Sequence, residues 1–173
     1  MLLLVSYKSL EFDEYDSFCF HSGIPFTGIC YDTYHAEQKS DQISDETSYY
    51  QGTKHGFERI WYSGGGIECE YELKNGYPHG VSWEWFLNGF LKSETLWKHN
   101  ITITNREWND QGDLINEYNI DNEPDSFAYE LLYVIISDYD GGAISPELNA
   151  FNEEIAQYIL KNSSSNVRWI ENT

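Results

Sequence analysis

The sequence predicts a mainly β protein of the α+β type, in which a meander of stacked antiparallel β-hairpins is followed by a small helical cap. Three observations lead to this prediction. Aromatic residues make up 17% of the 173 residues, whereas the chain has only five alanines and one methionine, and this composition favours strands. A tryptophan-glycine-glutamate pattern recurs through the middle of the chain, and the composition changes near Pro124.

The recurring pattern is W-x3-G-x4-E, and its three copies begin 24 and then 23 residues apart. Its members are Trp61, Gly65 and Glu70; Trp85, Gly89 and Glu94; and Trp108, Gly112 and Glu117. A second pattern, G-x3-G, precedes the first two tryptophans as Gly52 and Gly56 and as Gly76 and Gly80. The third copy has Asn100 and Thr104 at these places. Self-similarity at this period predicts a structure built from copies of one small unit.

Each unit is expected to be a hairpin, because glycine-rich and Asn-Gly links join segments of alternating polarity. The expected strands are 56–62, 67–73, 81–86 and 91–97. The expected turns are 63–66, 75–80, 88–89 and 110–112. An earlier, degenerate copy is expected to begin at 24–32, and the polar stretch 36–48 after it is interpreted as an insertion or long loop.

Alternation assigns the side chains to two faces of the expected sheet. Within 81–86, Val81, Trp83 and Trp85 oppose Ser82, Glu84 and Phe86. Within 67–73, Ile67, Cys69, Tyr71 and Leu73 oppose Glu68, Glu70 and Glu72. We therefore expect one apolar, aromatic face and one acidic face. The recurring Glu70, Glu94 and Glu117 are expected to be structural, with turn amides or neighbouring strands as partners.

These motifs together resemble the variant form of the MORN repeat. The two best copies are GTKHGFERIWYSGGGIECEYELKNG and GYPHGVSWEWFLNGFLKSETLWKHN, and the lead-in YDSFCFHSGIPFTGICYD resembles that of the YwqK-type antitoxin family. The resemblance covers about residues 20–118 and implies a repeat domain over 1–122. It also implies a role as the antitoxin or immunity partner of a bacterial toxin, although other MORN proteins act as scaffolds or at membranes.

Residues 123–173 are expected to form the helical cap, packed on the sheet as part of one compact unit. Helices are expected at about 125–138 and 146–161, the second with Ser145 as N-cap and Pro146 in its first turn. The apolar stripe of the second helix consists of Leu148, Phe151, Ile155 and Ile159. The tail is expected to end in a short strand through 167–170 or to fray.

The net charge of −19, from 29 acidic and 10 basic residues, limits the possible partners. It disfavours nucleic acid and anionic membranes, because phosphate groups are bound by Lys and Arg. It favours a basic protein partner, and plain solubility is the other explanation. Between Glu107 and Leu160 there are thirteen acidic residues and no Lys or Arg, which indicates either a face offered to such a partner or a solvated surface.

Cysteine usage and the chain start predict a cytoplasmic location. Cys19, Cys30 and Cys69 form no C-x2-C pair and fit a reducing compartment. The start MLLLVSYK lacks the basic region of a secretory signal, and no apolar run approaches the length of a membrane span.

No motif predicts catalysis, a cofactor or a metal. The segment 138–147 imitates an EF-hand loop but is too short, so a helix connector is the simpler interpretation. His55 and His79 occupy the same place in two units and are interpreted as turn residues rather than zinc ligands. The alternating carboxylates of 68–72 are explained by an exposed sheet face better than by a glycosidase pair.

From the resemblance and the charge, we expect a non-enzymatic immunity or antitoxin protein that binds one basic toxin domain and covers its active site. The residues expected to contact the toxin are Glu58, Glu68, Glu72, Trp83, Glu84, Phe86, Asp110, Asp113 and Asp121. The alternative is a MORN-repeat scaffold that binds other proteins, or copies of itself, through exposed sheet edges.

Overall fold

The structure is a computed structural model that describes residues 2–15, 17–34, 42–124, 126–132 and 145–162. Strands account for most of these residues. In chain order the elements are β1 (Leu4–Ser6), η1 (Tyr7–Ser9), β2 (Glu11–Phe12), β3 (Cys19–His21), β4 (Ile24–Pro25), β5 (Gly28–Thr33), β6 (Ile43–Tyr50), β7 (Thr53–Trp61), β8 (Ile67–Lys74), β9 (Tyr77–Trp85), β10 (Leu91–Lys98), β11 (Ile101–Trp108), β12 (Leu114–Asn119), η2 (Ile120–Asn122) and α2 (Pro146–Asn162). Residues 127–132 are also helical.

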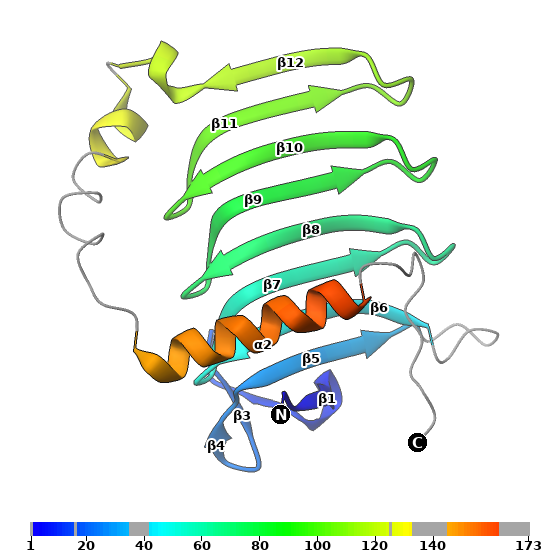
Figure 1. Cartoon of the computed structure of the whole chain (residues 1–173), viewed down its shortest axis with the longest axis vertical. Helices are drawn as coiled ribbons and strands as arrows, with labels where there is room; N and C mark the ends of the chain where they lie inside the picture. The colour runs from blue at the N-terminus through cyan, green and yellow to red at the C-terminus, as the bar shows by residue number, and fades with distance from the viewer. Residues whose placement is uncertain (1, 16, 35–41, 125, 133–144, 163–173) are drawn as a thin grey trace.

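Nine strands form one long sheet in the order β1-β5-β6-β7-β8-β9-β10-β11-β12 (Figure 1). From β6 onward each strand pairs antiparallel with the strand before it, so this part of the sheet is a meander. β1 closes one edge by pairing parallel with β5. The predicted mainly β fold, with a long meander and a C-terminal helix, is confirmed.

Three hairpin loops at one end of the sheet share one geometry. Gly65, Gly89 and Gly112 all have φ between +86° and +95°, where a side chain would be strained. Each donates its N–H to the carbonyl three residues earlier, at 2.8–3.0 Å, and that earlier residue donates its own N–H to the carbonyl just after the glycine. This is a three-residue loop closed by a left-handed glycine, and it confirms the turns predicted around these glycines.

The turns at the other end contain two residues with positive φ. They are Gln51–Gly52, Asn75–Gly76 and His99–Asn100, with φ from 49° to 86°. Both central residues of such a tight hairpin turn must be left-handed, and asparagine tolerates this conformation where glycine is missing. The turn predicted over 75–80 is too long, because Tyr77 to Gly80 already belong to β9.

The predicted insertion over 36–48 is wrong in its second half. Residues 43–48 belong to β6, which lies between β5 and β7 in the sheet. The segment looks like a loop because it contains Ser44, Asp45, Glu46, Thr47 and Ser48. Its polar side chains are nevertheless accommodated inside the protein by hydrogen bonds, as described below.

α2 packs on one face of the sheet over β5, β6 and β7, far from the strand that precedes it in the sequence (Figure 1). Its buried residues Phe151 and Ile155 contact Ile29 of β5 and Phe57 of β7 in one cluster. The whole predicted stripe takes part, since Leu148 and Ile159 pack against the same cluster. The prediction of this helix and of its buried side is confirmed.

The small sheet β2-β3-β4 covers the other face of the first strands. Its Cys19 packs with Leu10, Phe26, Cys30 and Tyr49 in a second buried cluster. No pattern in the sequence led us to expect the small sheet or the parallel strand β1, because these strands are only two or three residues long.

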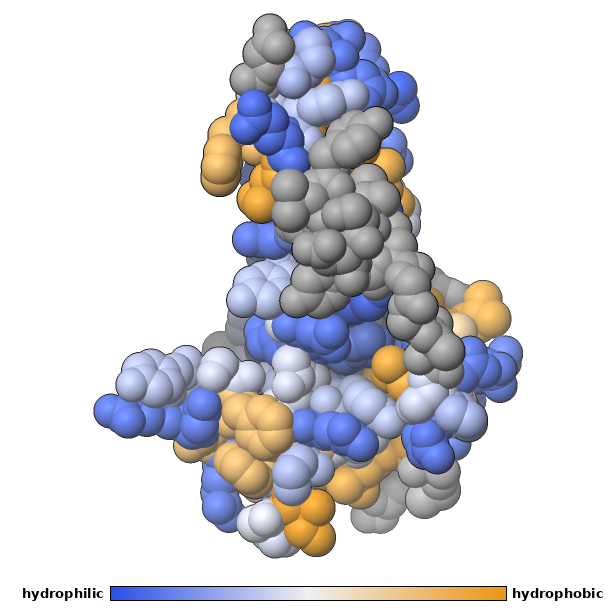
Figure 2. All heavy atoms as spheres, turned by 90° about the vertical axis from the view of Figure 1, so that its left-hand side faces the viewer, coloured by the Kyte–Doolittle hydropathy of each residue, from blue (hydrophilic) through white to orange (hydrophobic). Residues whose placement is uncertain are grey.

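Among the described residues, no second sheet covers β8 to β12, and only the helical segment 127–132 lies against β11 and β12, so this part of the sheet is largely a single layer. In these strands the buried apolar side chains are Cys69, Leu73 and Ile101, and most other side chains are partly or largely exposed. Figure 2 shows this thin upper part above the broader end that contains α2 and the small sheet. The segments predicted at 133–138, 138–144 and 167–170 lie outside the described residues.

Candidate protein-binding surface

A row of polar side chains crosses the sheet from β6 to β12, each directly opposite the next in the strand register. We call it the cross-strand row; its members are Glu46, Arg59, Glu70, Trp83, Glu94, Arg106 and Glu117. The row lies on the face that carries α2, which we call the α2 face. Carboxylates alternate in it with side chains that donate N–H groups.

Neighbours within the row form hydrogen bonds and ion pairs. Arg59 is ion-paired with Glu70, the indole Nε1 of Trp83 donates to Glu94 at 3.2 Å, and Arg106 Nε donates to Glu117 at 2.8 Å. Glu70, Glu94 and Glu117 were predicted to be structural, with either turn amides or neighbouring strands as partners. In the structure their partners are side chains of neighbouring strands.

Burial along the row is steeply graded. The Arg59 side chain is 5% exposed, whereas those of Arg106 and Glu117 are both 54% exposed. Glu46, at the buried end, is fully buried and accepts a hydrogen bond from the Tyr158 hydroxyl of α2 at 2.8 Å. The sequence analysis missed Glu46, although it lies 24 residues before Glu70, the spacing that separates Glu70 from Glu94.

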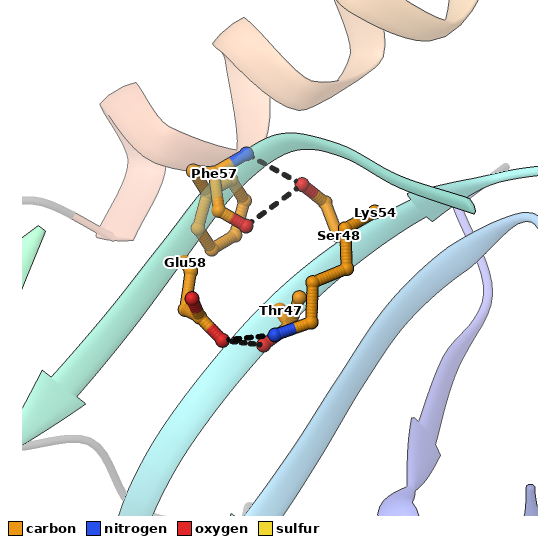
Figure 3. A network of polar contacts seen from close by, with 5 residues as sticks. All are labelled: Thr47, Ser48, Lys54, Phe57 and Glu58. Atoms are coloured by element: carbon orange, nitrogen blue, oxygen red, sulfur yellow. Dashed lines mark hydrogen bonds and ion pairs between the residues drawn. The ribbon is translucent and has the colours of Figure 1, made fainter. Parts of the chain in front are cut away.

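The opposite side of the sheet, which we call the far face, has a separate polar network. Glu58 accepts from Thr47 Oγ1 at 3.2 Å and pairs with Lys54 at 2.6 Å (Figure 3). Further along this face, Glu84 accepts from the Tyr71 hydroxyl at 3.0 Å and pairs with Lys92 at 2.9 Å.

The structure contradicts the prediction that one face is apolar and the other acidic. Glu70 is directly opposite Trp83, and Cys69 is directly opposite Glu84. Apart from Glu68, the alternation within these strands is as predicted, but this register places carboxylates of one strand beside aromatic and apolar side chains of the next. Both faces are therefore mixed, and each presents carboxylates next to aromatic rings.

The nine residues expected to bind a partner fall into four places, because the β11–β12 loop and η2 lie at opposite ends of β12. Glu72 and Trp83 lie on the α2 face and line the same groove. Glu58, Glu68 and Glu84 lie on the far face, and Phe86 lines a depression there with Glu84. Asp110 and Asp113 belong to the β11–β12 loop, and Asp121 lies in η2. The structure thus does not bring Glu68, Glu72 and Glu84 together on one face.

Glu68 departs from simple alternation because of a β-bulge. Ile60 is opposite Cys69 and Trp61 is opposite Ile67, so Glu68 is an extra residue in its strand. Glu68 lines a shallow pocket with Cys69, Tyr71 and Glu84 on the far face. A bulge rotates a side chain out of the period-2 pattern, which is why the sequence placed Glu68 on the wrong side.

β7 and β9 each contain a bulge at a glycine. In each strand the N–H of the residue after that glycine has no backbone partner, and a side chain of the preceding strand accepts its hydrogen bond. The Phe57 N–H, after Gly56, bonds to Ser48 Oγ at 2.6 Å (Figure 3). The Val81 N–H, after Gly80, bonds to the Glu72 carboxylate. A Cβ on Gly56 would meet Ser48 Oγ at 2.7 Å, and one on Gly80 would overlap the Glu72 carboxylate, so both positions require glycine.

Ser48→Ala is expected to lower the free energy of unfolding by about 1–3 kcal/mol, because the Phe57 N–H loses its acceptor in a buried place. Ser44→Ala is the control, since Ser44 is only half-buried and its Oγ donates to the carboxylate of the neighbouring Asp45 at 2.8 Å. We expect the control to cost about 1 kcal/mol or less. Urea unfolding measures both, and equal losses would contradict this role of Ser48.

A groove of about 520 Å³ runs along α2 on the α2 face. Its floor is formed by β8 and β9, with Glu70, Glu72, Val81 and Trp83. Its wall is the side of α2 that carries Leu148, Asn152, Ile155 and Ile159. The groove therefore combines an apolar wall with a floor of two carboxylates and an indole ring.

His55 lies at one end of this groove and is buried. It belongs to β7, and His79 belongs to β9, so the interpretation of both as turn residues is wrong. Burial lowers the pKa of His55, hydrogen bonds with Asn75 and Asn152 oppose this shift, and the charge of Lys74 adds to it.

This pKa shift predicts a loss of stability in mild acid. The unfolded chain takes up a proton on His55 near the ordinary pKa of 6.5, whereas the folded chain does so only at lower pH. Stability is therefore fully present above pH 6.5 and falls as the pH drops below it toward the folded pKa. We expect His55→Gln to flatten this decline between about pH 7 and 5.5 in urea unfolding, with His21→Gln in the small sheet as control. An unchanged slope in His55→Gln would refute the assignment.

The three cysteines are buried and free. Burial raises the pKa of Cys19 to about 11 and that of Cys30 and Cys69 to about 12. A thiol that stays protonated at neutral pH is a poor nucleophile, so these residues act as small apolar side chains.

Among the described residues, no three His, Cys, Asp or Glu side chains are grouped as metal ligands would be. In the same part of the chain, no helix combines the length and apolar character needed to cross a membrane. The scan against protein-family models gives no match, and the search of curated proteins gives no significant relative.

Proposed function

We propose that the hairpins are copies of one MORN-type unit and that the protein is an immunity or antitoxin protein that binds a basic toxin domain. Three recurring features support the repeat. Each feature recurs at a spacing of 23 or 24 residues. They are the left-handed glycines of the three loops, the side chains of Ser48 and Glu72 that accept a bulge N–H, and the carboxylates of the cross-strand row. Shared geometry at a shared spacing is what stacked repeats produce.

The observation that carries the functional proposal is the single-layer sheet with carboxylates and aromatic rings together on both faces. Trp83 lies beside Glu94 on the α2 face, and Tyr71 lies beside Glu84 on the far face. Aromatic side chains anchor protein interfaces, and carboxylates steer a positively charged partner toward them. With a net charge of −19, the protein attracts basic domains and repels copies of itself.

Affinity capture of the tagged full-length protein from its native cells, at moderate salt, tests this proposal. We expect one stoichiometric basic protein, which is toxic when expressed alone and harmless with this chain. Association should slow steeply as salt is added, because steering by charge is screened. A captured partner that is neither basic nor toxic would refute the immunity role, and so would the absence of any partner.

A scaffold role is the second candidate, and a different observation favours it. Four large apolar side chains are 51–72% exposed: Leu114 and Ile115 in the edge strand β12, and Leu87 and Phe90 in the β9–β10 loop. An exposed edge strand with apolar side chains can pair with another sheet edge. Light scattering separates the two roles: a monomer favours the immunity protein, whereas an oligomer that Ile115→Lys disperses favours the scaffold.

A further inference from the structure

We propose that the groove between α2 and strands β8–β9 is the docking site for a basic amphipathic helix of a protein partner. This proposal deepens the proposed function. It rests on that function in one respect, namely that the helix belongs to another protein. The spacing of the strands, the chemistry of the groove and the exposure of its carboxylates support this docking site.

The spacing of strands leaves room for one helix beside α2. α2 is centred on β6, because its buried cluster joins β5 and β7 and its Tyr158 bonds to Glu46. Packed helices lie about 8–10 Å apart, and neighbouring strands lie about 4.8 Å apart. A second helix would therefore be centred about two strands further on, over β8 (Figure 1). The lining of the groove places its floor at β8 and β9.

The wall of the groove fits the apolar side of such a helix. Leu148 and Ile159 of α2 are only half-buried, although they belong to the stripe that faces the sheet. Their uncovered sides, together with Val81 and the Trp83 ring on the floor, form an apolar strip along the groove. A helix with apolar residues at i, i+3 and i+4 covers such a strip.

The carboxylates of the floor specify a basic partner. Glu70 is ion-paired with the nearly buried Arg59, and its side chain remains 22% exposed. Glu72 is exposed as a residue, and its carboxylate lies over Gly80, held by the Val81 N–H. Partial burial of the carboxyl raises its pKa, and this hydrogen bond opposes the shift. An accessible carboxylate fixed by a backbone hydrogen bond is positioned in advance for a Lys or Arg side chain.

The inference can be tested without knowing the natural partner. The probe is a synthetic helical peptide with lysine on one face and leucine on the other, and its counterpart with glutamate in place of lysine serves as control. Fluorescence anisotropy of the labelled peptides measures binding to the full-length protein at low and high salt. We expect the lysine peptide to bind in a salt-dependent way and the glutamate peptide not to bind.

Variants locate the binding. Glu72→Gln keeps the size of the side chain and an acceptor for the Val81 N–H, so we expect it to fold and to bind the lysine peptide about tenfold more weakly. Val81→Lys places a positive charge on the floor and is expected to abolish binding. Glu107→Gln is the matched control, since it makes the same change of charge on the far face and should bind like the unmodified protein. Thermal unfolding checks that all three fold.

Several results would overturn the inference. One is that the lysine peptide does not bind. Another is that Glu72→Gln and Glu107→Gln weaken peptide binding equally. A third is that the free protein is a dimer that Val81→Lys dissociates, which would place a second copy in the groove. The proposed function fails separately. If a captured toxin binds Glu72→Gln and Val81→Lys as tightly as it binds the unmodified protein, the immunity role stands and the groove is not its site. If no toxin is captured but the peptide results hold, the groove stands and the immunity role falls.

Discussion

Replacing Arg59 with alanine is expected to lower the free energy of unfolding by about 3–5 kcal/mol, enough to unfold much of the protein at moderate temperature. The guanidinium is buried, ion-paired with Glu70 and directly opposite the fully buried Glu46. It also lies 4.9 Å from the centre of the Phe57 ring, so the substitution removes packing as well as charge. The fully buried Glu46 then remains without the cation opposite it, and the partly exposed Glu70 loses its partner, which is costly.

Arg106→Ala is the matched control, because Arg106 occupies the equivalent place at the exposed end of the cross-strand row. Its ion pair with Glu117 is solvent-exposed on both sides, so its loss is expected to cost about 0–1 kcal/mol. Urea unfolding followed by circular dichroism measures both variants. If both variants lost a similar amount of unfolding free energy, burial would not determine how much each ion pair of the row contributes to stability.

The second large effect is expected from Phe151→Ala, at about 3–5 kcal/mol. Phe151 is 6% exposed, lies 5.2 Å from the Tyr50 ring and is the central aromatic contact between α2 and the sheet. Its removal leaves a cavity under α2 and weakens the only helix over β5–β7 among the described residues. We expect a lower midpoint in urea and partial loss of the near-ultraviolet signal of the packed aromatic rings.

Leu160→Ala provides the comparison within the same helix. Leu160 is 68% exposed, so its truncation is expected to change the free energy of unfolding by no more than about 0.5 kcal/mol. If Phe151→Ala were as mild as this control, α2 would contribute little to holding the sheet together.

The parts of the fold that the sequence predicts are those with a local physical cause. Gly65, Gly89 and Gly112 mark their hairpin loops because a left-handed residue is needed there, whatever the rest of the chain does. The stripe of α2 follows from helical periodicity, and the strands between the turns follow from their length and alternation. These features require no knowledge of which segments meet in space.

The rest depends on long-range pairing, which one sequence does not reveal. β6 resembles a loop because its polar residues find partners only after folding, such as Tyr158 for Glu46 and the Phe57 N–H for Ser48. The prediction of an acidic face fails because strand register, not alternation, sets Glu70 beside Trp83. The candidate groove was not foreseen, since it exists only where α2 returns to the start of the sheet. Glu72 and Trp83 were predicted as binding residues, but their common location became clear only in the structure.

The graded burial of the cross-strand row implies that different parts of one sheet open at different free energies. Amide hydrogens in β6 and β7, beneath α2, are expected to exchange only through global unfolding, whereas those of β11 and β12 exchange through local opening. The strands β8 and β9 lie at the boundary between these two regimes. A ligand that binds there slows only the exchange that requires β8 and β9 to open, because local opening of β11 and β12 leaves its site intact. Strands β8 and β9 thus report an occupied groove by a rise in their amide protection, and β11 and β12 serve as the unchanged internal reference.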